Sequence, residues 1–188
     1  LLADGVHQAQ AARLRAMQLL AAIADSSSDA ICAKDLQGRY LLFNRTALQF
    51  TGKASLEDVL GYDDHDLFPA EQAEAVMAQD RQVVAENRTV SLEHSMVTAI
   101  GEVVFMTVKG PMRDSEGQVI GVYCISRDIT QKQQAEAYLR RSEQRYQLVL
   151  GATRDGIWDW DLCTGPAYLS PHYYQLAGYR PEDVTPDL

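Results

Sequence analysis

Side chains that could perform chemistry are few in this sequence, and they are widely spaced. The three cysteines, Cys32, Cys124 and Cys163, form no CxxC motif, so we expect neither a zinc site nor a disulfide framework, as in a reducing cytoplasm. Cys32 and Cys124 fall within apolar runs, where a thiol is ordinarily buried and inert, whereas a redox sensor requires exposure and a lowered pKa. The sequence contains no phosphate-binding loop, nucleophile elbow or metal-spaced cluster of His, Asp and Glu. We therefore expect no enzyme activity and no bound metal.

The composition is that of an ordinary soluble protein. The chain has 188 residues, 46% hydrophobic and 23% charged, which is enough for one domain and a remainder. Its formal net charge of -9 argues against nucleic-acid binding, which requires clustered Lys and Arg. No apolar stretch approaches the roughly 18 residues of a membrane helix, and the first residues do not resemble a signal peptide. We expect a cytoplasmic location, with a membrane segment elsewhere in a longer polypeptide left open.

Hydrophobic periodicity and turn residues predict an α+β domain. A helix over residues 2–24 precedes a hairpin, in which residues 35–38 turn between apolar runs at 30–34 and 39–43. Asn44 is placed to cap a short helix that Gly52 ends, and Pro69 to begin a longer helix that reaches about residue 87. Three strands follow, at 89–97, 102–112 and 118–127. This order predicts a five-stranded antiparallel sheet with short helices on one face.

The remainder carries a helix and a partial repeat of the domain. Residues 131–150 place a weak apolar core at heptad spacing, which predicts a short, adjustable two-helix contact: Ala135, Leu139, Ser142, Tyr146 and Val149. The element order of residues 29–52 then recurs over 155–178. We divide the chain into an N-terminal helix (1–25), a complete domain (26–130), a signalling helix (131–150) and the truncated start of a second domain (151–188). The second domain cannot bury its aromatic residues without further strands, so we expect disorder or docking onto another chain by exchange.

Several segments, taken in order, resemble motifs of the PAS/PAC family of sensor domains. They are SDAI at 28–31, KD at 34–35, GRY at 38–40, FNR at 43–45, DLFP at 66–69, KGPMRD at 109–114 and ISRDIT at 125–130. A partial second resemblance covers ATRDGIWDW at 152–160 and LSP at 169–171. The resemblance implies the PAS fold, flanked by signalling helices. It also implies a bacterial sensor in which a histidine kinase, diguanylate cyclase or phosphodiesterase lies downstream, although no motif of those output domains occurs in this sequence.

The same resemblance places a small pocket between the sheet and the short helices. Family register directs eight side chains inward: Cys32, His94, Met96, Phe105, Thr107, Val122, Cys124 and Ser126. A few polar groups in a mostly apolar set are typical of a small-ligand pocket. The alternative is a filled core with satisfied polar groups, because no residue marks a particular ligand.

Two cofactors of the family are disfavoured by this sequence, so the cofactor is unknown and we expect none to be bound. A covalent flavin requires a Cys near the start of the long helix, and no Cys lies between residues 32 and 124. Haem-binding members use a His on that helix, which has none. His65 lies in an acidic loop, where solvation or capping is the simpler role, and His94 is a remote second candidate. Non-covalent flavin beside Trp158 and Trp160 stays open for the second domain.

The outer face of the sheet is predicted to be apolar and to need a cover. We expect the N-terminal helix to supply it, in cis or from a second subunit. The result would be a parallel homodimer with these face residues: Leu14, Met17, Leu20, Tyr123 and Ile125.

The resemblance assigns signal transmission to the junction formed by Asp128, Ile129 and Thr130. Thr130 is expected to cap the following helix, and Asp128 to pair with one of three basic candidates: Lys34, Lys109 and Arg113. A change in the pocket would move the last strand and tilt or rotate the helix pair. The sequence therefore predicts a sensory input module, with a ligand-free dimerisation spacer as the alternative.

Overall fold

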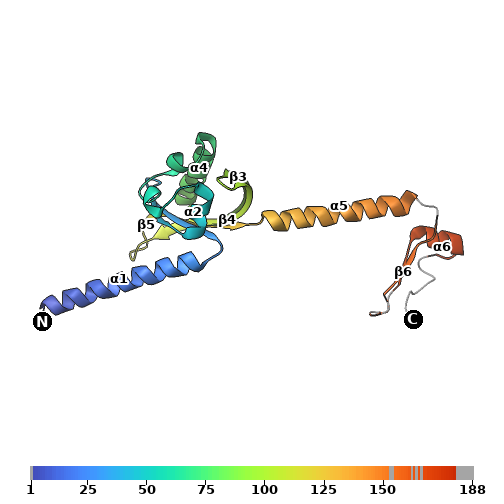
Figure 1. The fold of residues 1–188 in the computed structure, drawn as a ribbon, viewed down its shortest axis with the longest axis horizontal. Helices are drawn as coiled ribbons and strands as arrows, with labels where there is room; N and C mark the ends of the chain where they lie inside the picture. The colour runs from blue at the N-terminus through green and yellow to red at the C-terminus, as the bar shows by residue number, and fades with distance from the viewer. Residues whose placement is uncertain (1, 153–154, 162, 164, 166, 181–188) are drawn as a thin grey trace. The chain divides into compact units, whose positions relative to one another are not determined.

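The computed structural model describes residues 2–152, 155–161, 163, 165 and 167–180, in two compact units divided between residues 131 and 132. The first unit is built on a five-stranded antiparallel sheet of order β2-β1-β5-β4-β3 (Figure 1). Its strands are β1 (Ala30–Asp35), β2 (Tyr40–Phe43), β3 (Val90–Thr98), β4 (Gly101–Arg113) and β5 (Val119–Asp128). The predicted α+β class and five-stranded sheet are confirmed.

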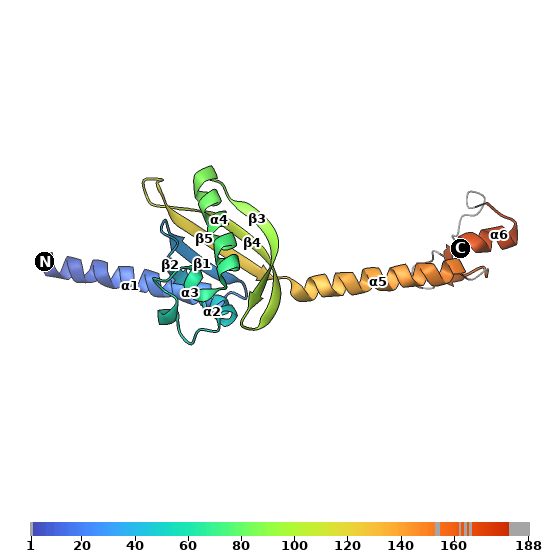
Figure 2. The same cartoon turned by 90° about the horizontal axis from the view of Figure 1, so that it is seen from above.

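Helical segments lie over one face of this sheet (Figure 2). They are α2 (Arg45–Thr51), a 3-10 turn (Leu56–Asp58), α3 (Asp64–Leu67) and α4 (Ala70–Glu86). Asn44 caps α2 by accepting a hydrogen bond from the Ala47 amide at 2.9 Å, and Gly52 ends the helix with a φ of 70°. Local residues therefore determine where α2 begins and ends.

The hairpin and α2 share an apolar core. Tyr40, Phe43, Ala47 and Val59 are buried together, and the rings of Tyr40 and Phe43 meet edge to face at 4.9 Å. Burial of a large apolar side chain stabilises a fold by roughly 1.5–3 kcal/mol. This core holds the first two strands against the helices that close the site.

The N-terminal helix α1 (Leu2–Ser26) is attached to the domain at its last turn. The Asn44 side chain donates to the Ala24 carbonyl at 2.7 Å, and the Arg45 amide donates to the Asp25 carboxylate at 2.7 Å. Ala24 is buried as a result.

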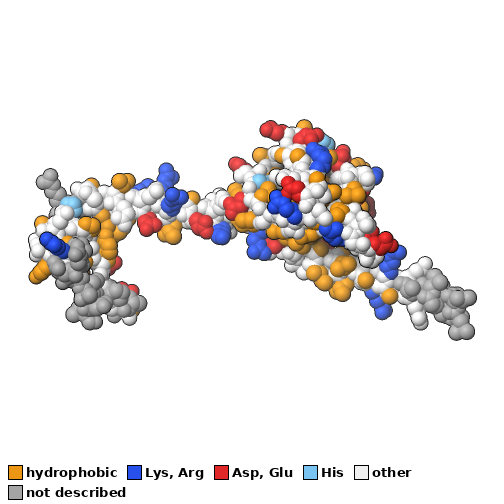
Figure 3. All heavy atoms as spheres, turned by 180° about the vertical axis from the view of Figure 1, so that it is seen from behind, with side chains coloured by type: hydrophobic (Ala, Val, Ile, Leu, Met, Phe, Trp, Pro, Cys, Tyr) orange, Lys and Arg blue, Asp and Glu red, His pale blue; other side chains and the backbone are white. Residues whose placement is uncertain are grey.

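Between Ala11 and Ile23, α1 presents its apolar side chains to solvent. Leu14, Met17 and Leu20 are 58%, 60% and 63% exposed. Ile125, on the outer face of β5, is 38% exposed, and Figure 3 shows hydrophobic side chains at the surface among charged ones. Leu14, Met17 and Leu20 therefore do not cover the outer face of the sheet within the same chain, because α1 packs against the domain through Ala24 instead.

The second unit contains a hairpin and two helices. Most of α5 (Thr130–Ala152) belongs to it, followed by β6 (Trp158–Trp160), β7 (Ala167–Leu169) and α6 (Pro171–Ala177). Trp158 and Trp160 are 62% and 38% exposed. Residues 153–154, 162, 164, 166 and 181–188 of the predicted second domain lie outside the described residues. None of the described helices is long and apolar enough to cross a bilayer.

Candidate ligand pocket and signalling junction

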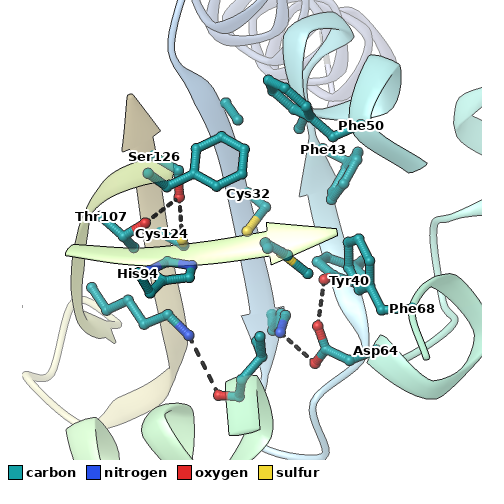
Figure 4. Close-up of a pocket in the computed structure, with 17 residues that line it drawn as sticks. Cys32, Tyr40, Phe43, Phe50, Asp64, Phe68, His94, Thr107, Cys124 and Ser126 are labelled. Carbon is teal, nitrogen blue, oxygen red and sulfur yellow. Dashed lines mark hydrogen bonds and ion pairs between the residues drawn. The ribbon is translucent and has the colours of Figure 1, made fainter. Parts of the chain in front are cut away.

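A cavity of about 80 Å³ lies between the sheet and helices α2–α4 (Figure 4). All five strands contribute to its lining. Phe50 and Phe105 meet edge to face at 4.9 Å on its apolar wall. The other large apolar side chains of the lining are Phe43, Phe68, Val76 and Met96.

Seven of the eight side chains predicted to point inward line this cavity. They are Cys32, His94, Met96, Phe105, Thr107, Cys124 and Ser126. The side-chain alternation of strands places them there, since alternate residues of each strand share a face.

Val122 is the exception, and its placement is a correction. It is buried, but it lines a separate hollow of about 290 Å³ between α4 and the β1–β2 turn. Val122 pairs with Lys34 across β1 and β5, and the Lys34 side chain lines both spaces. Val122 therefore lies near the end of β1 that leads into the turn, beyond the Cys32–Cys124 pair.

Hydroxyl, thiol and imidazole groups form the polar part of the cavity wall. Thr107 Oγ1 and Ser126 Oγ lie 2.8 Å apart, and Ser126 Oγ lies 3.4 Å from Cys124 Sγ. Nδ1 of His94 is buried and has no hydrogen-bond partner among the described residues. Burial lowers the pKa of His94, and the Lys109 ammonium lowers it further, so the ring is a neutral imidazole at pH 7. The cavity thus contains an imidazole nitrogen without a partner.

One end of the cavity is closed by a buried chain of charged side chains. Tyr40 donates to Asp64 at 2.7 Å, as Figure 4 shows, and Lys34 donates to Asp64 at 2.5 Å. Lys34 also donates to Asp80 at 2.7 Å, and Lys109 donates to the other oxygen of Asp80 at 2.6 Å. Because two ammonium groups meet two carboxylates, the cluster is formally neutral.

Attraction to their charged neighbours keeps Lys34 and Asp80 charged in spite of their burial. Burial by itself lowers the pKa of Lys34, but Asp80 and Asp64 outweigh it and raise that pKa above its usual value. Burial likewise raises the pKa of Asp80, yet the ammonium groups of Lys34 and Lys109 hold it below its usual value. Burial raises the pKa of Tyr40, and the nearby Cys32 and Asp64 raise it further, so its hydroxyl stays a donor. The result is a fixed polar wall beside an apolar space.

Sequence reasoning missed this cluster as a unit, although signals for it exist. Asp80 interrupts the apolar inner stripe of α4, while Lys34 and Lys109 occupy inward positions two residues beyond Cys32 and Thr107 on their strands. Charges at core positions require partners, since an unpaired buried charge is costly. From the sequence alone, that requirement could have predicted that Asp80 pairs with Lys34 and Lys109.

The arrangement is suited to binding a small molecule. Among the described residues, no group of three or more His, Cys, Asp and Glu side chains could hold a metal ion. The charged side chains of the cavity wall already contact opposite charges. What the wall offers a guest is apolar contact and a few hydrogen bonds.

The junction between β5 and α5 is bound directly to β4. The Ile129 amide donates to the Val104 carbonyl at 2.9 Å, and the Val104 amide donates to Thr130 Oγ1 at 2.9 Å. Asp128 accepts a hydrogen bond from the Thr130 amide at 2.8 Å. Val104 therefore holds the start of α5 through two hydrogen bonds, one of them to the Thr130 side chain.

Two expectations about this junction are corrected. Asp128, rather than Thr130, supplies the side chain that caps the start of α5. The three candidate partners of Asp128 are engaged elsewhere: Lys34 and Lys109 in the buried cluster, and Arg113 with the Gly117 carbonyl at 2.7 Å. A buried carboxylate needs an ammonium partner more than an exposed one does, so the lysines pair with the buried aspartates.

Residues 24–134 match the sequence profile of a family described as the PAS fold. The chain is 29% identical over 140 residues to the methanogenesis regulatory histidine kinase FilI of Methanothrix harundinacea, and the aligned region covers 74% of this chain and 16% of that protein. It is also 29% identical over 126 residues to a diguanylate cyclase of Vibrio cholerae, covering 63% of this chain and 36% of the relative. The chain therefore spans less than two fifths of the length of either relative.

Solved structures show the same fold. The PAS domain of BvgS from Bordetella pertussis superposes with a TM-score of 0.55 at 21% identity, covering 70% of this chain and 98% of that domain. At this level of identity the likeness concerns the arrangement of the elements alone.

Proposed function

The chain belongs to the PAS-fold family, and on that premise we propose that its complete domain is a sensory input module whose cavity binds a small ligand. The observation that carries the proposal is the continuity between cavity and junction. Cys124 and Ser126 line the cavity, and Asp128 caps α5 two residues further along the same strand. A ligand that shifts β5 would therefore act directly on the start of α5.

A second route from cavity to junction runs through β4. Phe105 lines the cavity, and its neighbour Val104 makes both hydrogen bonds to the start of α5. A displacement of the Phe105 ring would move the backbone that holds Ile129 and Thr130. Two packings of this junction that are close in energy would be sufficient for a switch.

The cavity favours a small uncharged ligand. A volume of about 80 Å³ leaves room for only a few non-hydrogen atoms, and the wall is rich in phenylalanine. A charged guest would lose its hydration without gaining a counter-charge, since the buried cluster is already neutral. The Thr107–Ser126 hydroxyl pair and Nδ1 of His94 would supply hydrogen bonds to one or two polar atoms of the ligand.

The two relatives favour an output domain in the same polypeptide. One is described as a histidine kinase and the other as a diguanylate cyclase. We infer a downstream output domain of one of these kinds, reached through α5. The exposed apolar residues of α1 and of the outer sheet face, Leu14, Met17, Leu20 and Ile125, favour a homodimer in which these surfaces, together with the half-buried Tyr123, cover one another.

Ligand binding can be tested with a library of small uncharged fragments and ligand-observed NMR. Ala47 is buried in the cavity wall, so Ala47→Leu fills the space, whereas Ala78→Leu adds the same side chain to the exposed face of α4. We expect fragments that bind the wild type and Ala78→Leu and are lost from Ala47→Leu. If no fragment binds, or if binding is equal in both variants, the ligand-free spacer is the better description.

A further inference from the structure

We propose that Cys32 and Cys124 form a redox-active thiol pair, which a peroxide converts into a disulfide between β1 and β5. The two residues are direct partners in the register of these antiparallel strands. Directly opposed residues have Cα atoms about 4.5–5.5 Å apart, and a disulfide accepts Cα separations of about 4.4–6.8 Å. The register therefore places the two Cα atoms at a separation that a disulfide accepts.

Both thiols enter the same cavity (Figure 4). Neither thiol is fully buried, because each borders the cavity instead of being enclosed by core atoms on all sides. A water molecule needs roughly 10–15 Å³ of such space, and the cavity of about 80 Å³ admits a molecule the size of hydrogen peroxide. The sequence alone predicts inert thiols, but their shared access to this space gives an oxidant a route to them.

The two thiols have different surroundings, which give them different pKa values and therefore different roles in the reaction. The neighbouring Cys32 thiol lowers the pKa of Cys124 to about 7 in spite of burial, and the Lys109 ammonium and Ser126 hydroxyl act in the same direction. The neighbouring Cys124, together with burial, raises the pKa of Cys32 well above its usual value. Cys124 is thus the nucleophile and Cys32 the resolving thiol, since the thiolate is the reactive form.

The chemistry balances with a peroxide as the oxidant. The Cys124 thiolate attacks one peroxide oxygen, the O–O bond breaks, and the departing hydroxide takes a proton to become water, leaving a sulfenic acid. The Cys32 sulfur then attacks the sulfenic sulfur, the S–O bond breaks, and the thiol proton leaves with hydroxide as a second water. Two thiols are oxidised to one disulfide while one peroxide is reduced to two waters, and a dithiol reductant reverses the change.

The disulfide would join the first and last strands of the domain at the cavity wall. Ser126 and Asp128 follow Cys124 on the same strand, on the way to α5. Formation of the bond does not depend on a ligand, so it can be measured whether or not the proposed ligand site exists.

The test uses the full chain with Cys163→Ser, which removes the exposed third thiol. After hydrogen peroxide treatment and alkylation with N-ethylmaleimide, we expect an intact mass that has lost two hydrogen atoms and carries no alkyl group. Peptide mapping should find the Cys32–Cys124 link, and dithiothreitol should restore two alkylation sites. The pH midpoint of the reaction rate should lie at about 7, compared with about 8.5 for an ordinary thiol.

Two serine variants assign the roles. Cys32→Ser should stop at a sulfenic acid that dimedone traps, whereas Cys124→Ser should lose at least about tenfold in peroxide reactivity, because burial still raises the pKa of the remaining Cys32 thiol. Circular dichroism and thermal melting check that each variant folds. The proposal is overturned if both thiols of the folded protein stay open to alkylation after excess peroxide, if the disulfide forms only in denaturant, or if it links two chains.

Discussion

Replacement of Asp80 by Asn provides the most direct test of the buried charge cluster. Asp80 is 8% exposed and bridges two ammonium groups, with Lys34 at 2.7 Å and Lys109 at 2.6 Å. Asparagine has nearly the same shape, so Asp80→Asn removes the charge and leaves the packing. The cluster then holds two ammonium groups against the single carboxylate of Asp64, an excess of one positive charge in the interior.

The expected cost is about 3–5 kcal/mol of unfolding free energy. At an effective dielectric constant of about 20, unit charges 2.7 Å apart attract one another by about 6 kcal/mol. Much of that attraction offsets the desolvation of the pair, and removal of one buried partner costs about 3–5 kcal/mol. Domains of this size are stable by only about 5–15 kcal/mol, so the variant should lose a large share of its stability.

Glu74→Gln is the matched control on the same helix. Glu74 is 61% exposed and lies 3.2 Å from His65 and 3.7 Å from Arg81. Exposed ion pairs contribute about 0–1 kcal/mol. Urea unfolding followed by circular dichroism should therefore separate the two variants clearly.

A double variant tells charge imbalance from a local packing defect. Asp80→Asn combined with Lys109→Gln leaves Lys34 and Asp64 as a balanced pair, so the double variant should be more stable than Asp80→Asn alone. A loss below about 1 kcal/mol for Asp80→Asn, or a double variant no more stable than the single one, would refute the reasoning.

The same cluster predicts how stability depends on pH. The folded pKa of Asp80 is held below its usual value of 3.8 because the attraction of Lys34 and Lys109 outweighs burial. A group with a depressed folded pKa contributes stability that is complete above its unfolded pKa and is lost as pH falls through the folded pKa. The wild type should therefore lose this contribution below about pH 4, and Asp80→Asn should lack that part of the acid transition.

Three further substitutions test the framework around the site. Asn44→Ala removes the α2 cap and the hydrogen bond to α1, and urea unfolding should show a loss of about 2 kcal/mol or more; a loss below about 0.5 kcal/mol would contradict the capping role. Gly121→Ala places a Cβ 2.0 Å from the Lys34 carbonyl oxygen, so the strands must separate; a melting temperature equal to that of the wild type would contradict this contact. Thr130→Val removes the acceptor of the Val104 amide, which should exchange with deuterium about fivefold faster, for a lost hydrogen bond of about 1 kcal/mol. Unchanged exchange there would show that the junction is held in another way.

Much of the fold follows from local signals in the sequence. Asn44 and Gly52 delimit α2 because a cap depends on residues within a few positions of it. Period-two alternation, with the register implied by the family resemblance, likewise placed seven of the eight predicted pocket side chains. Val122 follows the same alternation and still misses the cavity, because it pairs with Lys34 near the end of β1 and lines the hollow beside the β1–β2 turn instead.

Tertiary structure alone decided which charges and thiols meet. Lys34, Asp64, Asp80 and Lys109 come from β1, α3, α4 and β4, and no local pattern states that their side chains pair. Asp128 pairs with none of the three basic residues expected for it, and the two lysines among them pair with buried carboxylates, which have the greater need of a counter-charge. Cys32 faces Cys124 because β1 and β5, far apart in the chain, pair in one particular register. Periodicity assigns a residue to a face of the sheet, whereas the register between distant strands determines its partner.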